Sequence, residues 1–225
     1  GDLVKSSERY VSMVMMPVVA MIMVFAVPII DIILNSSFRP AAWSFRLLVV
    51  YAYVYTIGVP YTYLIVGMNR PGQNAKVVIM MGMVNIVLNL LLIPRGGLLS
   101  GIGISGIEGA AYAALISAFV MLAGLYYYSK KIIRRKLFQS KLFIHIGAGA
   151  IMGISIWALG TLFSAIRWYH LGLLFFIGLA VYLSVLWITG EFRKADLNFF
   201  LDTASPIKLF KHAKAEMKED PKFRQ

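Results

Sequence analysis

Two pairs of polar side chains within apolar segments are the residues of this sequence best suited to bind a polar ligand. Asn85 and Asn89 are four residues apart, so they share one helix face, where their amides can hydrogen-bond a neighbouring helix or line a cavity. Tyr51 and Tyr55 have the same spacing in the preceding apolar segment. The alternative roles are helix packing for the amides and an aromatic belt at the membrane surface for the tyrosines.

Charged residues and a Gly-Val-Pro step complete the candidate site. Arg46, Asp31 and Glu108 lie near the outer ends of their apolar segments, where a charged side chain reaches water at little cost. Each is therefore either an interfacial residue or part of an outward vestibule, and Arg46 is the one we carry forward as a cavity residue. Gly58 and Pro60 form a candidate hinge, because proline removes a backbone donor and permits a kink.

Enzymatic chemistry has no support in the sequence. Cysteine is absent, which excludes a disulfide, a thiolate metal site and a cysteine nucleophile. His145, His170 and His212 are too scattered to form a metal site. The glycine-rich stretch 96–109 lacks the Lys-Ser/Thr ending of a phosphate-binding loop. We therefore expect no enzyme, no catalytic residue, no metal and no cofactor.

The composition predicts which elements must position these residues. The 225 residues are 60% hydrophobic and only 14% charged, and the apolar residues occur in runs long enough to cross a bilayer. In lipid, a spanning segment must be a helix or part of a closed barrel, and these runs lack the alternation of barrel strands. We predict an all-α membrane protein with six transmembrane helices, at residues 11–34, 42–67, 77–93, 106–128, 142–163 and 171–189.

The positive charges predict the orientation of these helices. Most Lys and Arg residues fall in the N-terminal stretch, the second and fourth loops and the tail. The opposite side holds only Arg39, Arg46, Arg95 and Arg167. By the positive-inside rule both termini are cytoplasmic, in a plasma or inner membrane. The net charge of +12 is then a topology signal, and we expect no nucleic-acid partner.

The chain divides by hydropathy into five regions. Residues 1–10 are predicted to form a short polar helix or cytoplasmic linker, and residues 11–128 hold four helices. A basic cytoplasmic loop at 129–141 precedes a final helix pair at 142–189. Residues 190–225 are predicted to be an interfacial or disordered cytoplasmic tail.

Small residues and prolines predict how the helices pack and bend. Gly and Ala recur every four residues from Gly106, and a parallel ridge begins at Gly109, which predicts close packing of the fourth helix. Gly149 and Gly153 predict a close approach to another helix of the same chain. Pro17 and Pro28 permit kinks in the first helix, whose freed carbonyls neighbouring helices must satisfy.

Three sequence blocks resemble a known family of membrane transporters. They are GMNRP at 67–71, NIVLNLLLIP at 85–94 and GIEGAAYAA at 106–114. In this order and spacing they resemble the C-terminal half of polysaccharide and lipid-linked oligosaccharide flippases of the multidrug/oligosaccharidyl-lipid/polysaccharide exporter superfamily. The resemblance covers about residues 5–130 closely and departs from the family at Ala114, where threonine is common.

The resemblance implies a fold of fourteen helices in two six-helix lobes plus a final pair. This chain would supply the ninth to fourteenth helices and lack the preceding ones. It would be a flippase that moves a polyprenyl-linked sugar outward by alternating access. Its partners would be membrane lipids, that substrate and the remaining helices of the transporter. The candidate cavity residues would hold the sugar and phosphate groups.

Two other functions stay open at this point. A cation-coupled multidrug exporter of the same superfamily would need a buried carboxylate, and no acid lies in the middle of a predicted helix. A non-transporting membrane subunit of a glycan-assembly complex would have the same hydropathy pattern.

Overall fold

The described part of the chain is helical. The computed structural model describes residues 2–94, 105–133, 141–163, 166–193 and 196. Among them, six helices are long and apolar enough to cross a membrane: α1 (Asp2–Ile33), α2 (Ala42–Gly67), α3 (Pro71–Leu92), α4 (Gly106–Ile133), α5 (Lys141–Gly160) and α6 (Trp168–Ile188). A short 3-10 helix, η1 (Ser36–Ala41), joins α1 to α2. The predicted all-α fold with six helices able to span a membrane is confirmed, which indicates a multi-pass membrane protein.

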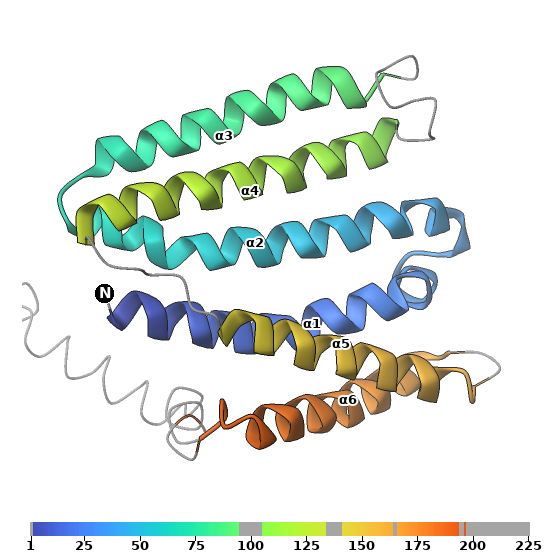
Figure 1. Cartoon of the computed structure of the whole chain (residues 1–225). Coiled ribbons are helices and arrows are strands. Elements are labelled where there is room, and N and C mark those ends of the chain that lie inside the picture. Colours follow the sequence, from blue (N-terminus) through green and yellow to red (C-terminus); the bar gives the residue numbers. More distant parts are fainter. Residues whose placement is uncertain (1, 95–104, 134–140, 164–165, 194–195, 197–225) are drawn as a thin grey trace, which may run out of the picture. The chain divides into compact units, whose positions relative to one another are not determined.

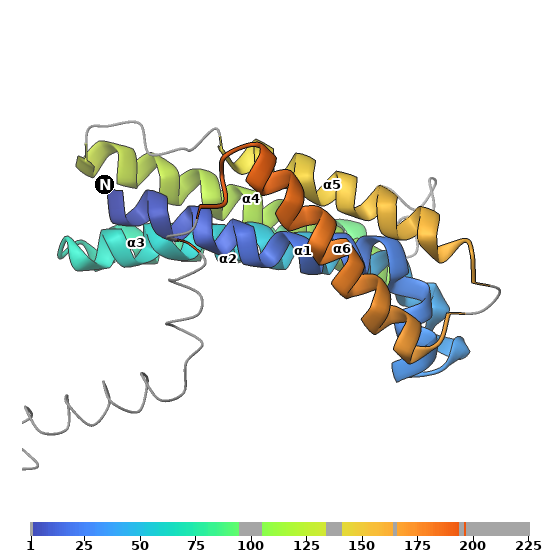
Figure 2. The same ribbon diagram turned by 90° about the horizontal axis from the view of Figure 1, so that it is seen from below.

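Five of the long helices lie side by side in an order that differs from the sequence order. Figure 1 shows the spatial order α3, α4, α2, α1 and α5, and each helix contacts the next one in this row. Figure 2 shows from below that the axes of α1 to α4 are roughly aligned, and consecutive helices run in opposite directions. The chain divides into two units, residues 1–182 and residues 183–225. In the second unit, α6 ends in a turn at Gly190, whose φ is 72°.

Helix α1 begins earlier than the hydropathy predicts. It contains 32 residues, which at 1.5 Å per residue gives about 48 Å, more than the roughly 30 Å of a bilayer core. The segment predicted as a short polar helix or linker is therefore helical and continuous with the first span. Its polar residues project beyond the apolar part of the same helix.

A proline bends α1 in its second half. Phe25 has non-helical dihedrals, with φ −106° and ψ 25°, three residues before Pro28. The proline ring has no N–H and clashes with the carbonyl one turn earlier, which opens the helix at this point. The kink expected from Pro28 is thus present. Pro17 lies within the same helix where no such break occurs.

The first motif block forms the turn between α2 and α3. Asn69 has a left-handed backbone with φ 57°, a conformation that asparagine tolerates better than most residues. The Arg70 N–H donates to the Ile65 carbonyl at 3.1 Å, and the Asn69 N–H donates to the Val66 carbonyl at 2.9 Å. These two bonds satisfy carbonyls at the end of α2, and Pro71 begins α3 where its missing N–H costs nothing.

The second and third blocks bring the backbones of α3 and α4 together. The Gly106 N–H donates to the Ile93 carbonyl at 2.9 Å, and Gly106 has a φ of 57°. A Cβ placed on Gly109 would fall on the Leu92 carbonyl oxygen and 3.2 Å from the Ile93 nitrogen. Gly109, Ala113 and Ser117 are buried, so this ridge of small residues packs as predicted.

The glycine pair of α5 packs within the same chain. Gly149 lies against Met16 of α1, with the Met16 Cγ 3.5 Å from an added Cβ, and Gly153 lies against Val24 at 3.7 Å. The expectation that these glycines serve intramolecular packing is confirmed for the contact with α1.

Apolar side chains cover much of the outer surface, above all on α3. Its buried residues are Val77 and Leu92, whereas Ile79, Ile86 and Leu90 are each exposed by more than half. A helix that is apolar on all sides is suited to lipid or to a further membrane-embedded partner. The predicted basic loop and tail fall largely outside the described residues.

The close approach of α3 and α4 predicts that Gly109→Ala destabilises the protein. The new methyl group meets backbone that cannot move aside, and overpacking of this kind costs about 1–3 kcal/mol. Thermal unfolding in detergent measures the change. The matched control is Gly82→Ala in α3, where an added Cβ has no neighbour within 4 Å among the described residues. Equal stability of the two variants would contradict this account.

Candidate functional site

Arg46 lies beside the kink of α1 and donates to its backbone. The Arg46 Nε is 2.9 Å from the Met23 carbonyl oxygen, on the N-terminal side of the break at Phe25. A polar backbone group in lipid needs a partner, and a bent helix leaves its neighbouring carbonyls less well paired. One described role of Arg46 is therefore to tie α2 to the bend of α1.

Asp31 and Arg39 form an ion pair near the end of α1. The Arg39 Nε is 2.7 Å from Asp31 Oδ1, and the Arg39 Nη2 is 2.8 Å from Oδ2, so the pair is bidentate. The arrangement joins the end of α1 to η1. Asp31 thus has a partner within its own chain, as a charged group close to the membrane surface requires.

The two candidate amides form one hydrogen-bond chain towards α4. The Asn89 Nδ2 donates to Asn85 Oδ1 at 3.0 Å, and the Asn85 Nδ2 donates to the Ser117 hydroxyl at 3.3 Å. Ser117 in turn donates to the Ala114 carbonyl at 2.8 Å. The amide pair therefore links α3 to α4. The Asn89 Oδ1 is buried and accepts no hydrogen bond within the described structure.

The tyrosine pair lies on an outward face of α2. The rings of Tyr51 and Tyr55 are 5.9 Å apart between centroids, and Tyr55 is 44% exposed. No hydrogen bond between described residues joins this pair to Arg46 or to the two asparagines. The structure therefore places the predicted cavity residues in three separate groups along α2 and α3.

The proposed hinge lies in a continuous helix. Gly58 packs against α4, since an added Cβ would be 3.0 Å from Met121 Cε and 3.2 Å from Leu125 Cδ1. Pro60 is buried, and α2 runs as one helix from Ala42 to Gly67. Gly58 therefore permits a close helix contact, and a hinge at Gly58 and Pro60 stays a prediction.

One buried acid escaped the sequence analysis. Glu8 of α1 is 1% exposed, and it lies four residues from Val4 and four from Ser12, which are also buried. This i, i+4 spacing places the three residues on one helix face. It was the sequence pattern that could have predicted a buried Glu8. It was missed because residues 1–10 were assigned to a segment outside the first span.

The face of α1 that carries Glu8 meets two tyrosines of α2. The Ser12 hydroxyl and the Tyr53 hydroxyl are 2.8 Å apart, and Val4 shares a core cluster with Tyr61. Glu8 interacts with the Tyr61 hydroxyl, and it also has an electrostatic interaction with the Tyr53 hydroxyl. Neither oxygen of Glu8, nor the hydroxyl of Tyr61, completes a hydrogen bond of good geometry in the described structure.

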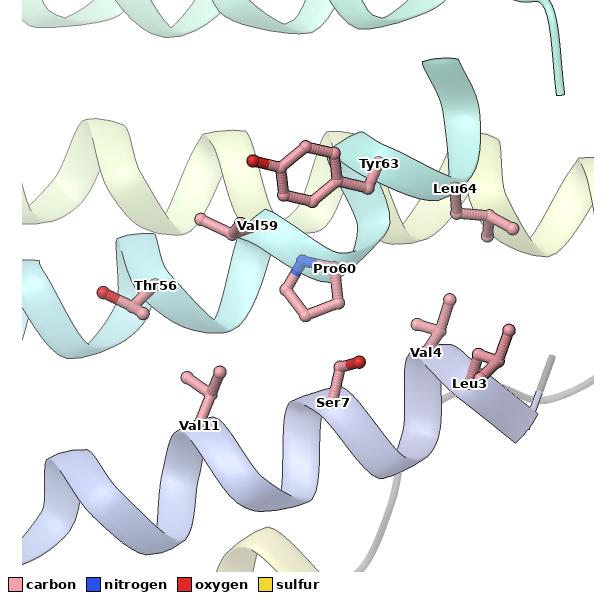
Figure 3. A pocket seen from close by; sticks show the side chains of 9 residues that line it. All are labelled: Leu3, Val4, Ser7, Val11, Thr56, Val59, Pro60, Tyr63 and Leu64. Carbon is pink, nitrogen blue, oxygen red and sulfur yellow. The ribbon is translucent and has the colours of Figure 1, made fainter. Parts of the chain in front are cut away.

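A cavity of about 420 Å³ lies between α1 and α2. Figure 3 shows Ser7 of α1 and Pro60 of α2 pointing towards each other across it. Its lining consists of Leu3, Val4, Ser7, Val11, Thr56, Val59, Pro60, Tyr63 and Leu64. A second cavity of about 360 Å³, near the other end of these helices, is lined almost wholly by apolar residues. Such cavities suit apolar chains more than sugars.

The described residues hold no group of three or more His, Asp or Glu side chains that could bind a metal ion. Their polar side chains are amides, hydroxyls and single charges, which can bind and orient a ligand by hydrogen bonds. No family model, curated protein or solved structure matches the chain.

The contact between Arg46 and the kink predicts an energetic coupling with Pro28. Arg46→Met removes a charged hydrogen bond to the backbone, which is worth about 1.5–3 kcal/mol. In a Pro28→Ala background α1 straightens and the Met23 carbonyl is realigned along the helix axis, away from Arg46, so the same substitution costs much less. A double-mutant cycle of unfolding free energies in detergent measures this difference. Additive effects would show that Arg46 acts independently of the kink.

Proposed function

We propose that this chain is the C-terminal half of a flippase that moves a polyprenyl-linked oligosaccharide or polysaccharide unit across the membrane by alternating access. It acts together with a preceding set of helices that forms the other lobe. Both termini lie in the cytoplasm, and the membrane is the plasma or inner membrane. The chain binds and moves its substrate without enzymatic chemistry.

The observation that carries the proposal is the position of the three motif blocks. Block 67–71 forms the turn that ends α2, and blocks 85–94 and 106–114 meet at a close backbone contact between α3 and α4. Residues that resemble the family therefore occupy positions with demanding backbone geometry. A resemblance that arose from apolar composition alone would not be expected to coincide with this turn and this close helix contact.

The exposed faces support a partner lobe. Tyr51 and Tyr55 lie on an outward face of α2, next to apolar residues such as Leu48. Aromatic rings and hydroxyls together suit the stacking and hydrogen bonding of sugars. In the proposed transporter this face of α2 borders the central cavity. The buried acceptor oxygen of Asn89 in α3, which has no described donor, is a separate candidate contact.

A cation-coupled multidrug exporter is the second candidate, and Glu8 is the observation that favours it. Such an exporter needs a buried carboxyl, which the hydropathy analysis did not find and which α1 provides. Both candidates share the alternating-access cycle and differ in substrate. A sugar-lipid translocation assay with a drug-export assay beside it separates them.

The orientation can be tested directly because the chain contains no cysteine. We expect a single cysteine at Lys130 to react with a membrane-impermeant maleimide only after permeabilisation of the cells. A single cysteine at Arg39 should react in intact cells. The two positions lie at opposite ends of the predicted spans, so each is the control for the other. The reverse labelling pattern would contradict the proposed orientation.

Translocation of a lipid-linked oligosaccharide by the full-length protein in proteoliposomes tests the function. We expect Asn89→Leu to lower the initial rate about fivefold, the effect of one lost substrate hydrogen bond of about 1 kcal/mol, with a smaller loss of protein abundance than Asn85→Leu because the link to Ser117 remains. Asn85→Leu is the matched control, because it also breaks the link to Ser117 and should lower stability.

Two results would count against this assignment. Equal losses of abundance and rate in both variants would show that the amides serve packing alone. Absence of translocation by the wild-type protein, with intact helical structure, would favour the drug-export or non-transporting alternatives.

A further inference from the structure

Glu8 is a buried titratable group without a role in the proposed substrate site. It lies between α1 and α2, with 1% of its surface exposed, and Tyr61 beside it is equally buried. The carboxyl oxygens and the Tyr61 hydroxyl all lack a well-formed hydrogen bond within the described structure. Ionisable groups buried in a membrane protein are costly, and for that reason they usually mark functional sites.

The groups of α2 that interact with Glu8 are uncharged. Its interacting groups on α2 are the phenols Tyr61 and Tyr53, each able to donate or accept a hydrogen bond. Lys5 and Arg9 flank it in the sequence of α1, but no ion pair joins Glu8 to the described residues. Helix α5, which also packs on α1, carries the buried His145. A carboxylate buried without a cation is far more costly than the neutral acid.

We propose that Glu8 is a proton-binding site at the interface of α1 and α2, and that it holds a proton while these helices are packed together. A proton from water adds to one carboxylate oxygen and forms an O–H bond. The resulting neutral acid needs no cation, and its carbonyl oxygen can accept a hydrogen bond from the Tyr61 hydroxyl. When the helices separate and water reaches the carboxyl, the same proton returns to water and the carboxylate re-forms.

This proton site would favour one conformation of the helix pair. Protonation stabilises the packed arrangement, and ionisation stabilises a hydrated, open one, so the proton shifts the equilibrium between them. The cavity of Figure 3 lies between the same two helices and is lined by Ser7 and Pro60, the sequence neighbours of Glu8 and Tyr61, so it leaves room for α1 and α2 to move. The role of the site in transport rests on the proposed function, whereas the binding of a proton does not.

Infrared difference spectroscopy of the full-length protein in lipid nanodiscs tests the proton directly. The carbonyl band of a protonated carboxylic acid should be present at neutral pH and disappear at alkaline pH. It should be lost in Glu8→Gln, which keeps the shape of the side chain, and retained in the control Glu108→Gln, an acid in the first turn of α4. Identical spectra of wild type and Glu8→Gln at every pH would overturn the proposal.

A second measurement covers the case in which Glu8→Gln does not fold. Dicyclohexylcarbodiimide modifies protonated carboxyl groups in apolar surroundings, and peptide mass spectrometry locates the product. We expect modification of Glu8 in the wild-type protein that falls as the pH rises. Modification of Glu8 that does not depend on pH would overturn the proposal.

The translocation assay separates this proposal from the proposed function. If both hold, the wild-type rate falls as the pH rises and the Glu8→Gln rate does not vary with pH. A protonated Glu8 in a protein that translocates no sugar-lipid would reject the proposed function and keep the proton site. Translocation of the sugar-lipid by a protein whose Glu8 is ionised would reject the proton site and keep the proposed function.

Discussion

The structure depends on one constraint: lipid offers no hydrogen bonds to a polar group. Each described span therefore closes its own backbone bonds as a helix, and at two interruptions a nearby donor is present. At the kink of α1 the donor is Arg46, which reaches the Met23 carbonyl. At the end of α2 the donors are backbone N–H groups of the turn around Asn69.

The same constraint explains where small and polar residues occur together. Helices in a membrane gain little by hiding apolar surface from lipid, so they associate through close packing and interhelical hydrogen bonds. The contact between α3 and α4 uses both means, because Gly109 admits the backbone at Leu92 and Asn85 bonds to Ser117. The main role of an amide in this contact is to hold the two helices together. Of the two amides, Asn89 is the one whose acceptor oxygen has no described partner and can bond a ligand.

The proposed functions depend on surfaces and side chains that helix packing does not use. An outward face of α2 with Tyr51 and Tyr55 and an apolar α3 suit a helix bundle that completes itself with a partner lobe and lipid. Glu8 differs from Asp31 in having no charged partner in the described structure. Asp31 pairs with Arg39, whereas Glu8 faces phenols. The protonation state of Glu8 therefore determines whether the interface of α1 and α2 contains an unpaired charge.

The sequence by itself determined the class of fold, because runs of apolar residues are a local property that any single helix displays. The bounds of α2 and the kink near Pro28 followed from such local rules. The start of α1 did not, since hydropathy treats a charged residue as a boundary, whereas Glu8 is buried by contacts with α2. Only the tertiary structure decided that Arg46 meets a carbonyl of α1 and that Gly58 meets α4. Such partners depend on which helices become neighbours, and the row α3, α4, α2, α1, α5 is not the order of the chain.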